Sequence, residues 1–359
     1  MKILVTGGCG FFGHHLVEHL IKNTDAEIAI IDKLTYASNG FDRLRNINCF
    51  DDKRVSIYTH DFTNEMPFGI QYELGKITHI VHCGAETHVD TSITDPLRFV
   101  RANVLGTAQM LQYARQLDSL EQFLYFSTDE VFGPAGTQWH EITANWRIEA
   151  KNLYHFAFYD EWDRYNSTNP YSATKAAGEE LCLAWANTYK LPIIITHCMN
   201  LFGERQHPEK FIPNTIIKVL NGDTVTIHSD SSKERSGSRF YLHARNAADA
   251  VLFLLRHKPA VRDKFNIVGQ REISNLELAK MIANMLNCLL QYEMVDFHSS
   301  RPGHDLRYAL DGSKLVSLGW GHPLSLEESL GKTVKWFLEH PSWLGLPNNK
   351  REREVSYGF

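Results

Sequence analysis

The sequence predicts an α/β protein built around a doubly wound parallel sheet. In its first 200 residues, short apolar runs alternate with longer helical patterns, and a glycine-rich turn joins the first run to the first helical pattern. This alternation is typical of strand–helix–strand units, whose parallel strands are buried on both faces. The expected strands are Ile3–Val5, Glu27–Ile31, His79–Cys83, Phe123–Ser127 and Pro192–Thr196. The expected helices between them include Phe11–Ile21, Pro96–Leu117 and Ser172–Tyr189.

Beyond Asn200 the pattern loosens into short strands and loops. Ser274 with Glu277, and Ser325 with Glu328, have the spacing of capping boxes and predict the starts of two further helices. We therefore expect a first domain over residues 1–200 and a smaller C-terminal α/β lobe over residues 201–345, partly interleaved with it. A charged tail over residues 346–359 completes the chain.

The bulk composition argues against several classes of protein. The 359 residues, of which 43% are hydrophobic, suffice to bury a large core. The net charge of −5 comes without a basic block, which argues against nucleic-acid binding. The apolar start of the chain is too short for a signal peptide or a membrane span, so a cytoplasmic protein is expected. The six cysteines form no CxxC pair and the 18 histidines form no HExxH motif, which predicts free thiols and no metal.

The glycine-rich turn has the spacing GxxGxxG and lies between the first strand and the first helix. Glycines there permit a tight turn and let backbone N–H groups at the helix N-terminus approach a pyrophosphate. Alone, such a run is also compatible with a structural turn. The candidate dinucleotide-binding residues of this Rossmann-type turn are Gly7, Gly10, Phe11, Phe12 and Gly13.

Asp32 strengthens this interpretation because it ends the second strand, where a carboxylate can accept hydrogen bonds from the adenosine ribose hydroxyls. Its charge would repel a 2′-phosphate, which favours NAD over NADP. Lys33 and Arg43 are nearby cations that would instead favour binding of a 2′-phosphate. Asp61 and Phe62, after the third strand, are candidates to contact the adenine, with an ordinary turn as the alternative.

Tyr171 and Lys175 form a YxxxK pair at the start of a helix, preceded by Asn169-Pro170. A spacing of four residues places both side chains on one helical face. A nearby ammonium favours the phenolate, so we expect the pKa of Tyr171 to be lowered towards neutral pH and the tyrosine to accept a hydroxyl proton.

Thr128, Asp129 and Glu130 follow the buried strand that ends at Ser127. Ligands bind at the carboxyl ends of parallel strands in sheets of this kind. Thr128 can form a hydrogen bond with a substrate hydroxyl. The two carboxyl groups can divide the roles of acid and base if their surroundings separate their pKa values.

Together these motifs resemble the extended short-chain dehydrogenase/reductase superfamily, and within it the nucleotide-sugar 4,6-dehydratases, nearest to the dTDP-glucose 4,6-dehydratases. The most specific element is Thr128–Glu130 with the Val-Phe-Gly that follows, since related epimerases and decarboxylases typically replace at least one of the carboxylates. The resemblance covers nearly the whole chain and rests on the glycine turn, Asp32–Ala37, Ser127–Gly133, Tyr171–Lys175, Pro208–Pro213 and Arg301–Asp305.

The resemblance implies a lyase that uses a tightly held NAD without net redox change. Tyr171 would take the C4 hydroxyl proton of a nucleotide-linked hexose while hydride passes from C4 to NAD⁺. Glu130 would then remove the C5 proton as Asp129 protonates the departing C6 hydroxyl, and the hydride would return to C6 with a proton delivered to C5. The substrate-binding residues that it implies are Thr128, Asn200, Lys210, Phe211, Arg239, Asn266, Arg301 and His304.

The resemblance also implies a homodimer through the helices at Pro96–Leu117 and Ser172–Tyr189. Apolar side chains for that interface would come from Leu105, Ala108, Leu111, Leu181, Ala184 and Trp185. Some of them must face the sheet of their own protomer instead.

Two segments depart from the family pattern. The stretch between Glu130 and Tyr171 is longer than expected and carries an aromatic run, which suits a lid, a partner surface or local packing. The segment His228–Phe240 is also expanded: His228 stands where an aromatic residue is common, and Arg239 is offset by one, so the base and sugar stay open. The aromatic run consists of Tyr154, His155, Phe156, Phe158, Tyr159, Trp162 and Tyr165.

Two rival functions remain at this point. An NAD-dependent 4-epimerase or decarboxylase of the same superfamily would share the fold, NAD and the YxxxK pair, but it has no need for Asp129 as an acid. A binding module that senses NAD without catalysis would not need Tyr171 and Lys175.

Overall fold

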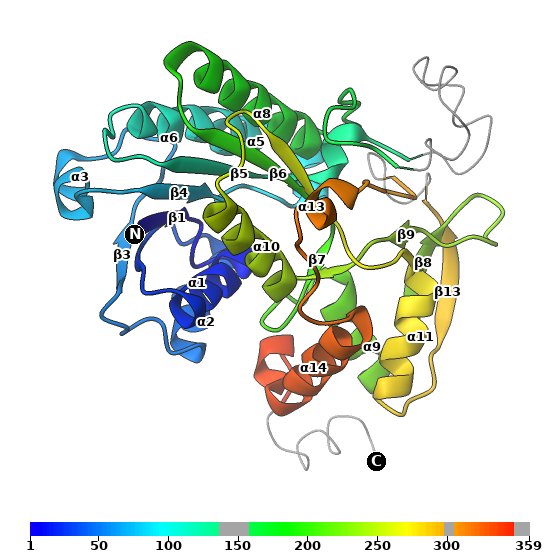
Figure 1. Cartoon of the computed structure of the whole chain (residues 1–359). Helices are drawn as coiled ribbons and strands as arrows, with labels where there is room; N and C mark the ends of the chain where they lie inside the picture. The colour runs from blue at the N-terminus through cyan, green and yellow to red at the C-terminus, as the bar shows by residue number, and fades with distance from the viewer. Residues whose placement is uncertain (136–157, 298–304, 348–359) are drawn as a thin grey trace.

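The computed structural model describes residues 1–135, 158–297 and 305–347 (Figure 1). Its centre is a seven-stranded sheet in the order β11-β6-β5-β4-β1-β2-β3. Every pairing in this sheet is parallel, as the sequence predicts. The strands are β1 (Lys2–Thr6), β2 (Glu27–Asp32), β3 (Val55–Thr59), β4 (His79–His82), β5 (Gln122–Thr128), β6 (Ile193–Cys198) and β11 (Lys264–Ile267).

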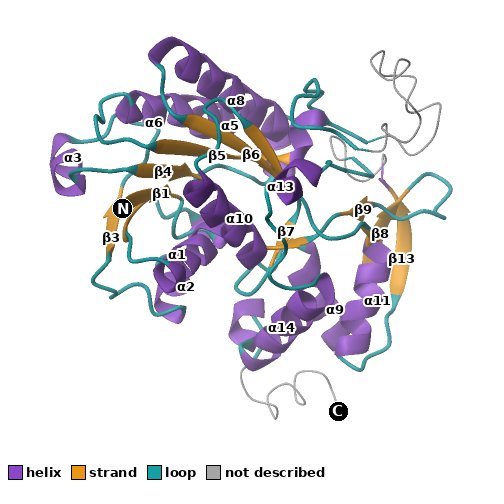
Figure 2. Ribbon diagram, viewed as in Figure 1, coloured by secondary structure: helices purple, strands orange, loops and turns teal. Residues whose placement is uncertain are grey.

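Helices cover both faces of the sheet, so that alternate side chains of each strand are buried in different cores (Figure 2). Ile3 and Val5 pack with α1 (Phe11–Asn23) and α10 (Ala244–His257) on one face. Leu4, between them, packs with α6 (Gly106–Ala114) and α8 (Pro170–Tyr189) on the other. The doubly wound α/β architecture is therefore confirmed.

One predicted helix is not regular. The pattern at Pro96–Leu117 folds as α5 (Pro96–Phe99), a wider π-helical stretch at Val100–Leu105, and α6. Gly106 follows the wide stretch, and a Cβ there would lie 2.5 Å from the ring of Phe62. The close approach of this helix to the sheet thus depends on a residue without a side chain.

The lobe beyond residue 200 is assembled from small pieces that sit apart from the main sheet (Figure 1). Its strand pairs are β7 (Leu201–Phe202) with β10 (Leu242–His243), β8 (Val225–Ser229) with β13 (Tyr292–Asp296), and β9 (Ser238–Arg239) with β12 (Ile273–Ser274). Its main helices, which share one hydrophobic cluster, are α9 (Phe211–Asn221), α11 (Asn275–Met285) and α14 (Leu326–Glu339). The remaining helices are α2 (Asp42–Asn46), α3 (Phe68–Leu74), α4 (Val89–Thr94) and α13 (Ser313–Ser317).

The chain returns to the first domain in the middle of this lobe. Helix α10 packs against α1, and β11 extends the main sheet beside β6. The predicted helix starts also have identifiable caps. Ser325 and Glu328 form a reciprocal capping box at α14, and the Ser274 hydroxyl accepts from the backbone N–H of Glu277 at 3.1 Å.

All six cysteines are free thiols. Within the described ranges, no helix combines the length and the apolar character that crossing a membrane requires.

Candidate active site

The glycine turn between β1 and α1 is packed too closely for side chains. A Cβ on Gly13 would lie 2.0 Å from the carbonyl oxygen of Gly7, and Gly7 itself has a φ of +70°. Only glycine fits at these two positions, as in the tight turns that bring backbone N–H groups close to a pyrophosphate. Phe11 and Phe12 open α1, and the Phe12 ring stacks on Phe126 with a centroid distance of 4.1 Å.

Asp32 ends β2 beside this turn and is nearly buried. Its carboxylate accepts backbone N–H groups of Cys9 at 3.0 Å and Leu34 at 2.8 Å. Burial raises the pKa of Asp32, and these two N–H groups oppose that shift. A carboxylate oxygen has two acceptor positions, so each oxygen keeps capacity for a ribose hydroxyl.

The two cations near Asp32 are engaged elsewhere. Lys33 lies 3.3 Å from a Glu86 carboxylate oxygen and 3.9 Å from one of Asp61. Arg43 is buried and donates to the backbone carbonyl oxygens of Ala37 at 2.6 Å and Arg205 at 3.1 Å. The Lys33 ammonium and the Arg43 guanidinium are thus held by protein groups rather than placed to bind a 2′-phosphate, which agrees with the preference for NAD.

Asp61 and Phe62 have different environments. Asp61 is partly exposed, and its carboxylate accepts the N–H of Thr63 at 3.0 Å. The Phe62 ring is buried in the core under α6, edge-on to His82. The Phe62 ring is therefore a core side chain, and contact of Asp61 and Phe62 with an adenine stays a prediction.

We expect Asp32→Ala to weaken NAD binding about ten- to a hundredfold, the cost of losing charge-assisted hydrogen bonds to the ribose. Calorimetric titration of the NAD-free protein measures this, with Asp32→Asn as the matched variant that keeps the shape and removes the charge. Unchanged NAD affinity in a folded Asp32→Ala protein, or a wild-type preference for NADP, would contradict the assignment.

Tyr171 and Lys175 lie on one buried face of α8, next to the ends of β4 and β5. The Asn169 side chain and Ser172 cap the helix reciprocally and so fix its first turn. The Tyr171 hydroxyl forms a hydrogen bond with the Thr128 side chain. The Lys175 ammonium donates to the carbonyl oxygen of Phe126 at 2.8 Å.

The expected lowering of the Tyr171 pKa is wrong for the protein by itself. Burial raises the pKa of Tyr171 well above its ordinary value, and the neighbouring Glu130 and Asp129 raise it further. The hydrogen bond between Tyr171 and Thr128 acts in the opposite direction but does not outweigh them. The sequence spacing places Lys175 correctly on the helix but does not reveal the two carboxylates that face the phenol.

The acidic pair follows β5, where Thr128 ends the strand and accepts the N–H of Glu130. Burial and the charge of Glu130 raise the pKa of Asp129 to about 7. Thr128 donates to one Asp129 carboxylate oxygen at 3.0 Å, and the other oxygen is buried with no partner among the described residues. Burial also raises the pKa of Glu130, but the Asn169 side chain, at 3.1 Å, and Arg239 counteract it.

Three further candidate substrate residues have different surroundings. The Asn200 side-chain oxygen, after β6, is buried with no partner in the described part of the chain. Lys210 occupies the N-cap position of α9, and its charge lowers the pKa of Glu130. The Phe211 ring lies in the lobe core, stacked on Tyr241 with centroids 6.4 Å apart.

Arg239 and Asn266 bond to the protein itself. The Arg239 guanidinium donates to the carbonyl oxygens of Asp305 at 2.5 Å and Leu306 at 2.6 Å. Asn266, in β11, is fully buried and its amide donates to the carbonyl oxygen of Asp311 at 2.9 Å. The predicted Arg301 and His304 lie outside the described residues.

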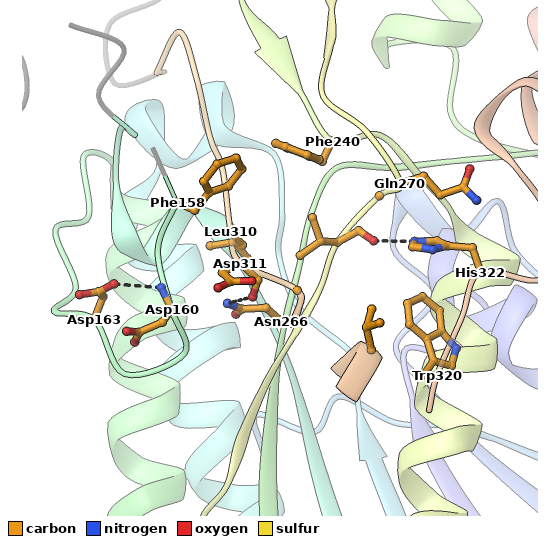
Figure 3. A pocket seen from close by; sticks show the side chains of 14 residues that line it. Phe158, Asp160, Asp163, Phe240, Asn266, Gln270, Leu310, Asp311, Trp320 and His322 are labelled. Carbon is orange, nitrogen blue, oxygen red and sulfur yellow. Dashed lines mark hydrogen bonds between the residues drawn. The ribbon is translucent and has the colours of Figure 1, made fainter. Parts of the chain in front are cut away.

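A cavity of about 1090 Å³ opens beside β11 and is lined by Phe158, Asp160, Phe240, Asn266, Trp320 and His322 among others (Figure 3). None of the candidate catalytic residues lines it. Phe240 belongs to the hydrophobic cluster that contains Val131 and Phe132, immediately after the acidic pair. This cavity is therefore not the candidate active site.

The sequence interpretation did not assign roles to Asn169 and Tyr308. Asn169 joins the cap of α8 to Glu130. Tyr308 is buried, its hydroxyl has no partner among the described residues, and Glu130 and Asp129 both act on it electrostatically. Asn169 was signalled by its place before the YxxxK pair, whereas nothing local marks Tyr308.

The model of the NAD dependent epimerase/dehydratase family matches residues 3–269. The chain belongs to this family. The dTDP-glucose 4,6-dehydratase of Escherichia coli is 33% identical, over 96% of this chain and 94% of its own. That of Neisseria meningitidis serogroup B is 34% identical, over 95% and 94%. The structure of the dTDP-glucose 4,6-dehydratase DesIV from Streptomyces venezuelae, with NAD bound, superposes with a TM-score of 0.80 at 30% identity, covering 96% of this chain and 98% of that one.

This family uses NAD, and the bare glycine turn with Asp32 at its side fits that cofactor. The resemblance to nucleotide-sugar 4,6-dehydratases inferred from the sequence motifs is thereby confirmed.

Proposed function

We propose that this NAD-dependent enzyme converts a nucleotide-linked hexose of the dTDP-glucose or UDP-glucose type to its 4-keto-6-deoxy form. The observation that carries this proposal is the buried carboxyl pair beside Tyr171. One member, Asp129, has a pKa of about 7, and one of its oxygens has no partner among the described residues. An elimination of water needs an acid of this kind for the departing hydroxyl, whereas an epimerisation does not.

The first step is oxidation at C4, for which NAD supplies the hydride acceptor and later returns the hydride to C6. Tyr171 accepts the C4 hydroxyl proton, and Thr128, bonded to that phenol, orients the hydroxyl. Because burial and the carboxylates raise the Tyr171 pKa, positive charge close to the phenol is what makes proton transfer feasible. Lys175 provides a fixed ammonium on the same helical face.

The second step divides the work between the two carboxyl groups. Asp129 is partly protonated at neutral pH and protonates the leaving C6 hydroxyl. Burial raises the pKa of Glu130, and Asn169, Arg239 and Lys210 oppose that shift. Glu130 removes the C5 proton, and a proton returns to C5 when the hydride reaches C6. Two titratable groups whose surroundings separate their pKa values are the usual basis for such a division.

The test is incubation of the pure protein with dTDP-, UDP-, GDP- and CDP-hexoses, followed by analysis of the products. The proposal expects a product that has lost one water and absorbs at alkaline pH, as a 4-keto-6-deoxy sugar does. An epimerised product of unchanged mass would overturn the proposal and support the 4-epimerase instead. No turnover of any of these hexoses would overturn it as well.

We also propose a homodimer through α4, the α5–α6 region and α8, which pack side by side. The exposed apolar residues Ile93, Leu97, Val100 and Leu105 form a stripe along α4 and the α5–α6 region. On α8, Ala184 is exposed, and Leu181 and Trp185 are partly buried. Ala108 is partly buried, whereas Leu111 faces the protomer's own core and is not available for this interface.

Leu97→Asp should therefore shift the protein from dimer to monomer, because it places a charge in the middle of this stripe. Light scattering at micromolar concentration measures the mass. Phe68→Asp, on α3, is a matched control because it places the same charge at another apolar side chain, which is 81% exposed. A monomeric wild type, or a dimer that tolerates Leu97→Asp, would count against this interface.

The free state of the six cysteines supports a reducing compartment, and we propose the cytoplasm.

A further inference from the structure

A buried carboxylate lies behind the candidate catalytic helix. Glu179 follows Lys175 by one turn of α8 on the same inward face and has no exposed surface. Its carboxylate accepts from the hydroxyl of Ser127 and from that of Tyr165. It is also 2.9 Å from His197 Nε2 and 3.6 Å from Lys264 Nζ. An ionised group at such depth is retained only when it is fully paired.

The partners of Glu179 come from four separate parts of the chain. Ser127 is on β5, His197 on β6 and Lys264 on β11, while Tyr165 belongs to the aromatic run that precedes α8. The Tyr165 hydroxyl also bonds to Lys264. The chain thus ties the extra aromatic segment into the sheet at the point where α8 packs on it.

Asn266 completes the arrangement from the far side. Its side-chain oxygen is 2.9 Å from His197 Nδ1, and its amide nitrogen donates to the backbone of Tyr159 at 3.2 Å. Burial would raise the pKa of Glu179, but His197, Lys264 and Ser127 outweigh burial and hold that pKa below its usual range. Glu179 is therefore a fixed negative charge.

This charge has two neighbours close to the reacting groups. Ser127, bonded to Glu179, immediately precedes Thr128, Asp129 and Glu130. Lys175 is the other neighbour: burial lowers its pKa to about 8, and the charge of Glu179 is the largest influence in the opposite direction.

The other groups that face Lys175 supply little charge. Cys182 on α8 is a buried thiol and Cys83 after β4 is a partly buried one, and burial raises the pKa of both. His82 on β4 has its pKa lowered by burial to about 3 and is neutral. The Tyr125 ring on β5 lies 4.2 Å from the Lys175 ammonium.

We propose that Glu179 is a positioning residue for this reaction: from behind α8 it holds Lys175 charged and, through Ser127, fixes the turn that carries the acidic pair. Tyr165, His197 and Lys264 anchor it, which gives part of the added aromatic segment a role in catalysis. The inference rests on the proposed function for the identity of the reaction, and on the contacts above for the role of Glu179.

The decisive variant is Glu179→Gln, which keeps the shape and removes the charge. Lys175 then loses its proton at lower pH, so the alkaline limb of kcat should move down by about 1–3 pH units, the usual effect of removing a close opposite charge. At pH 8 a shift of 1 unit from the wild-type pKa of about 8 lowers the protonated fraction of Lys175, and with it kcat, about fivefold, and a shift of 3 units lowers them about 500-fold. KM should change little because Glu179 touches no substrate. Glu179→Asp keeps the charge, so the alkaline fall in kcat should return part of the way to its wild-type pH. Glu180→Gln, at the exposed neighbouring position, should leave that fall at its wild-type pH.

A merely structural role would lower the unfolding temperature without moving the alkaline limb. A folded Glu179→Gln enzyme with wild-type kcat and alkaline limb would overturn the proposal. If that variant does not fold, Tyr165→Phe decides, since it removes one hydroxyl donor and keeps the ring. Tyr165→Phe should move the limb in the same direction by a smaller amount, and an unmoved limb with unchanged kcat would reject the inference.

The two proposals fail in different ways. If the wild type makes an epimerised product, the dehydratase assignment falls. Glu179 is then still tested by the pH dependence of reduced-cofactor formation, because Tyr171 and Lys175 serve C4 oxidation in both reactions.

Discussion

Replacing Asp129 with asparagine should stop the reaction after the sugar has been oxidised. The amide cannot protonate the C6 hydroxyl, and losing a general acid typically costs about 10²–10⁴-fold in rate. Oxidation at C4 depends on Tyr171 instead and should be much less affected. Reduced cofactor should therefore accumulate together with a 4-keto hexose, as absorbance of the bound cofactor and mass spectrometry would show.

The pH dependence gives a second view of the same group. Because the pKa of Asp129 is raised to about 7, its acid form predominates below that pH and is lost above it. Loss of the C6 hydroxyl should slow as the pH rises through 7, and Asp129→Asn should remove this dependence. Glu130→Gln serves as the paired variant: it should block exchange of the C5 hydrogen with deuterated water. An Asp129→Asn enzyme that turned over at the wild-type rate would sink the dehydratase assignment.

Tyr171→Phe should suppress every step, including the first. The ring remains to fill its buried position, but no group is left to accept the C4 hydroxyl proton, and a fall in kcat of about 10³-fold or more is expected. Reduced cofactor should not accumulate, in contrast to Asp129→Asn. Rapid-mixing absorbance of the bound cofactor distinguishes the two variants directly. Substantial cofactor reduction by Tyr171→Phe would show that another group accepts the proton.

The contrast between these variants depends on environments rather than on residue types. Asp129 and Glu130 are adjacent in the chain, yet their hydrogen-bond partners differ. Asn169 supports the ionised form of Glu130 at 3.1 Å, while one Asp129 oxygen has no partner among the described residues. Neutral and ionised carboxyl groups can therefore lie side by side at one pH.

Short-range patterns were enough to predict much of this protein. The parallel strands, the glycine turn, Asp32 at the end of β2 and the YxxxK pair each depend on residues within one or two turns of one another. Their periodicity and spacing are visible without the fold. The strand-end position of Thr128–Glu130 was also predictable, because the ends of buried parallel strands meet at one edge of the sheet.

Other properties depended on residues far apart in the sequence, and only the tertiary structure decided them. Glu130 and Asp129 face Tyr171 and raise its pKa, which reverses the effect expected from Lys175 alone. Asn266 fits a substrate motif in the sequence but lies buried in β11, bonded to His197. Glu179 gains its partners from three strands and the aromatic run. Spacing along one helix determines which side chains share a face, whereas burial and the charges brought opposite that face determine their protonation.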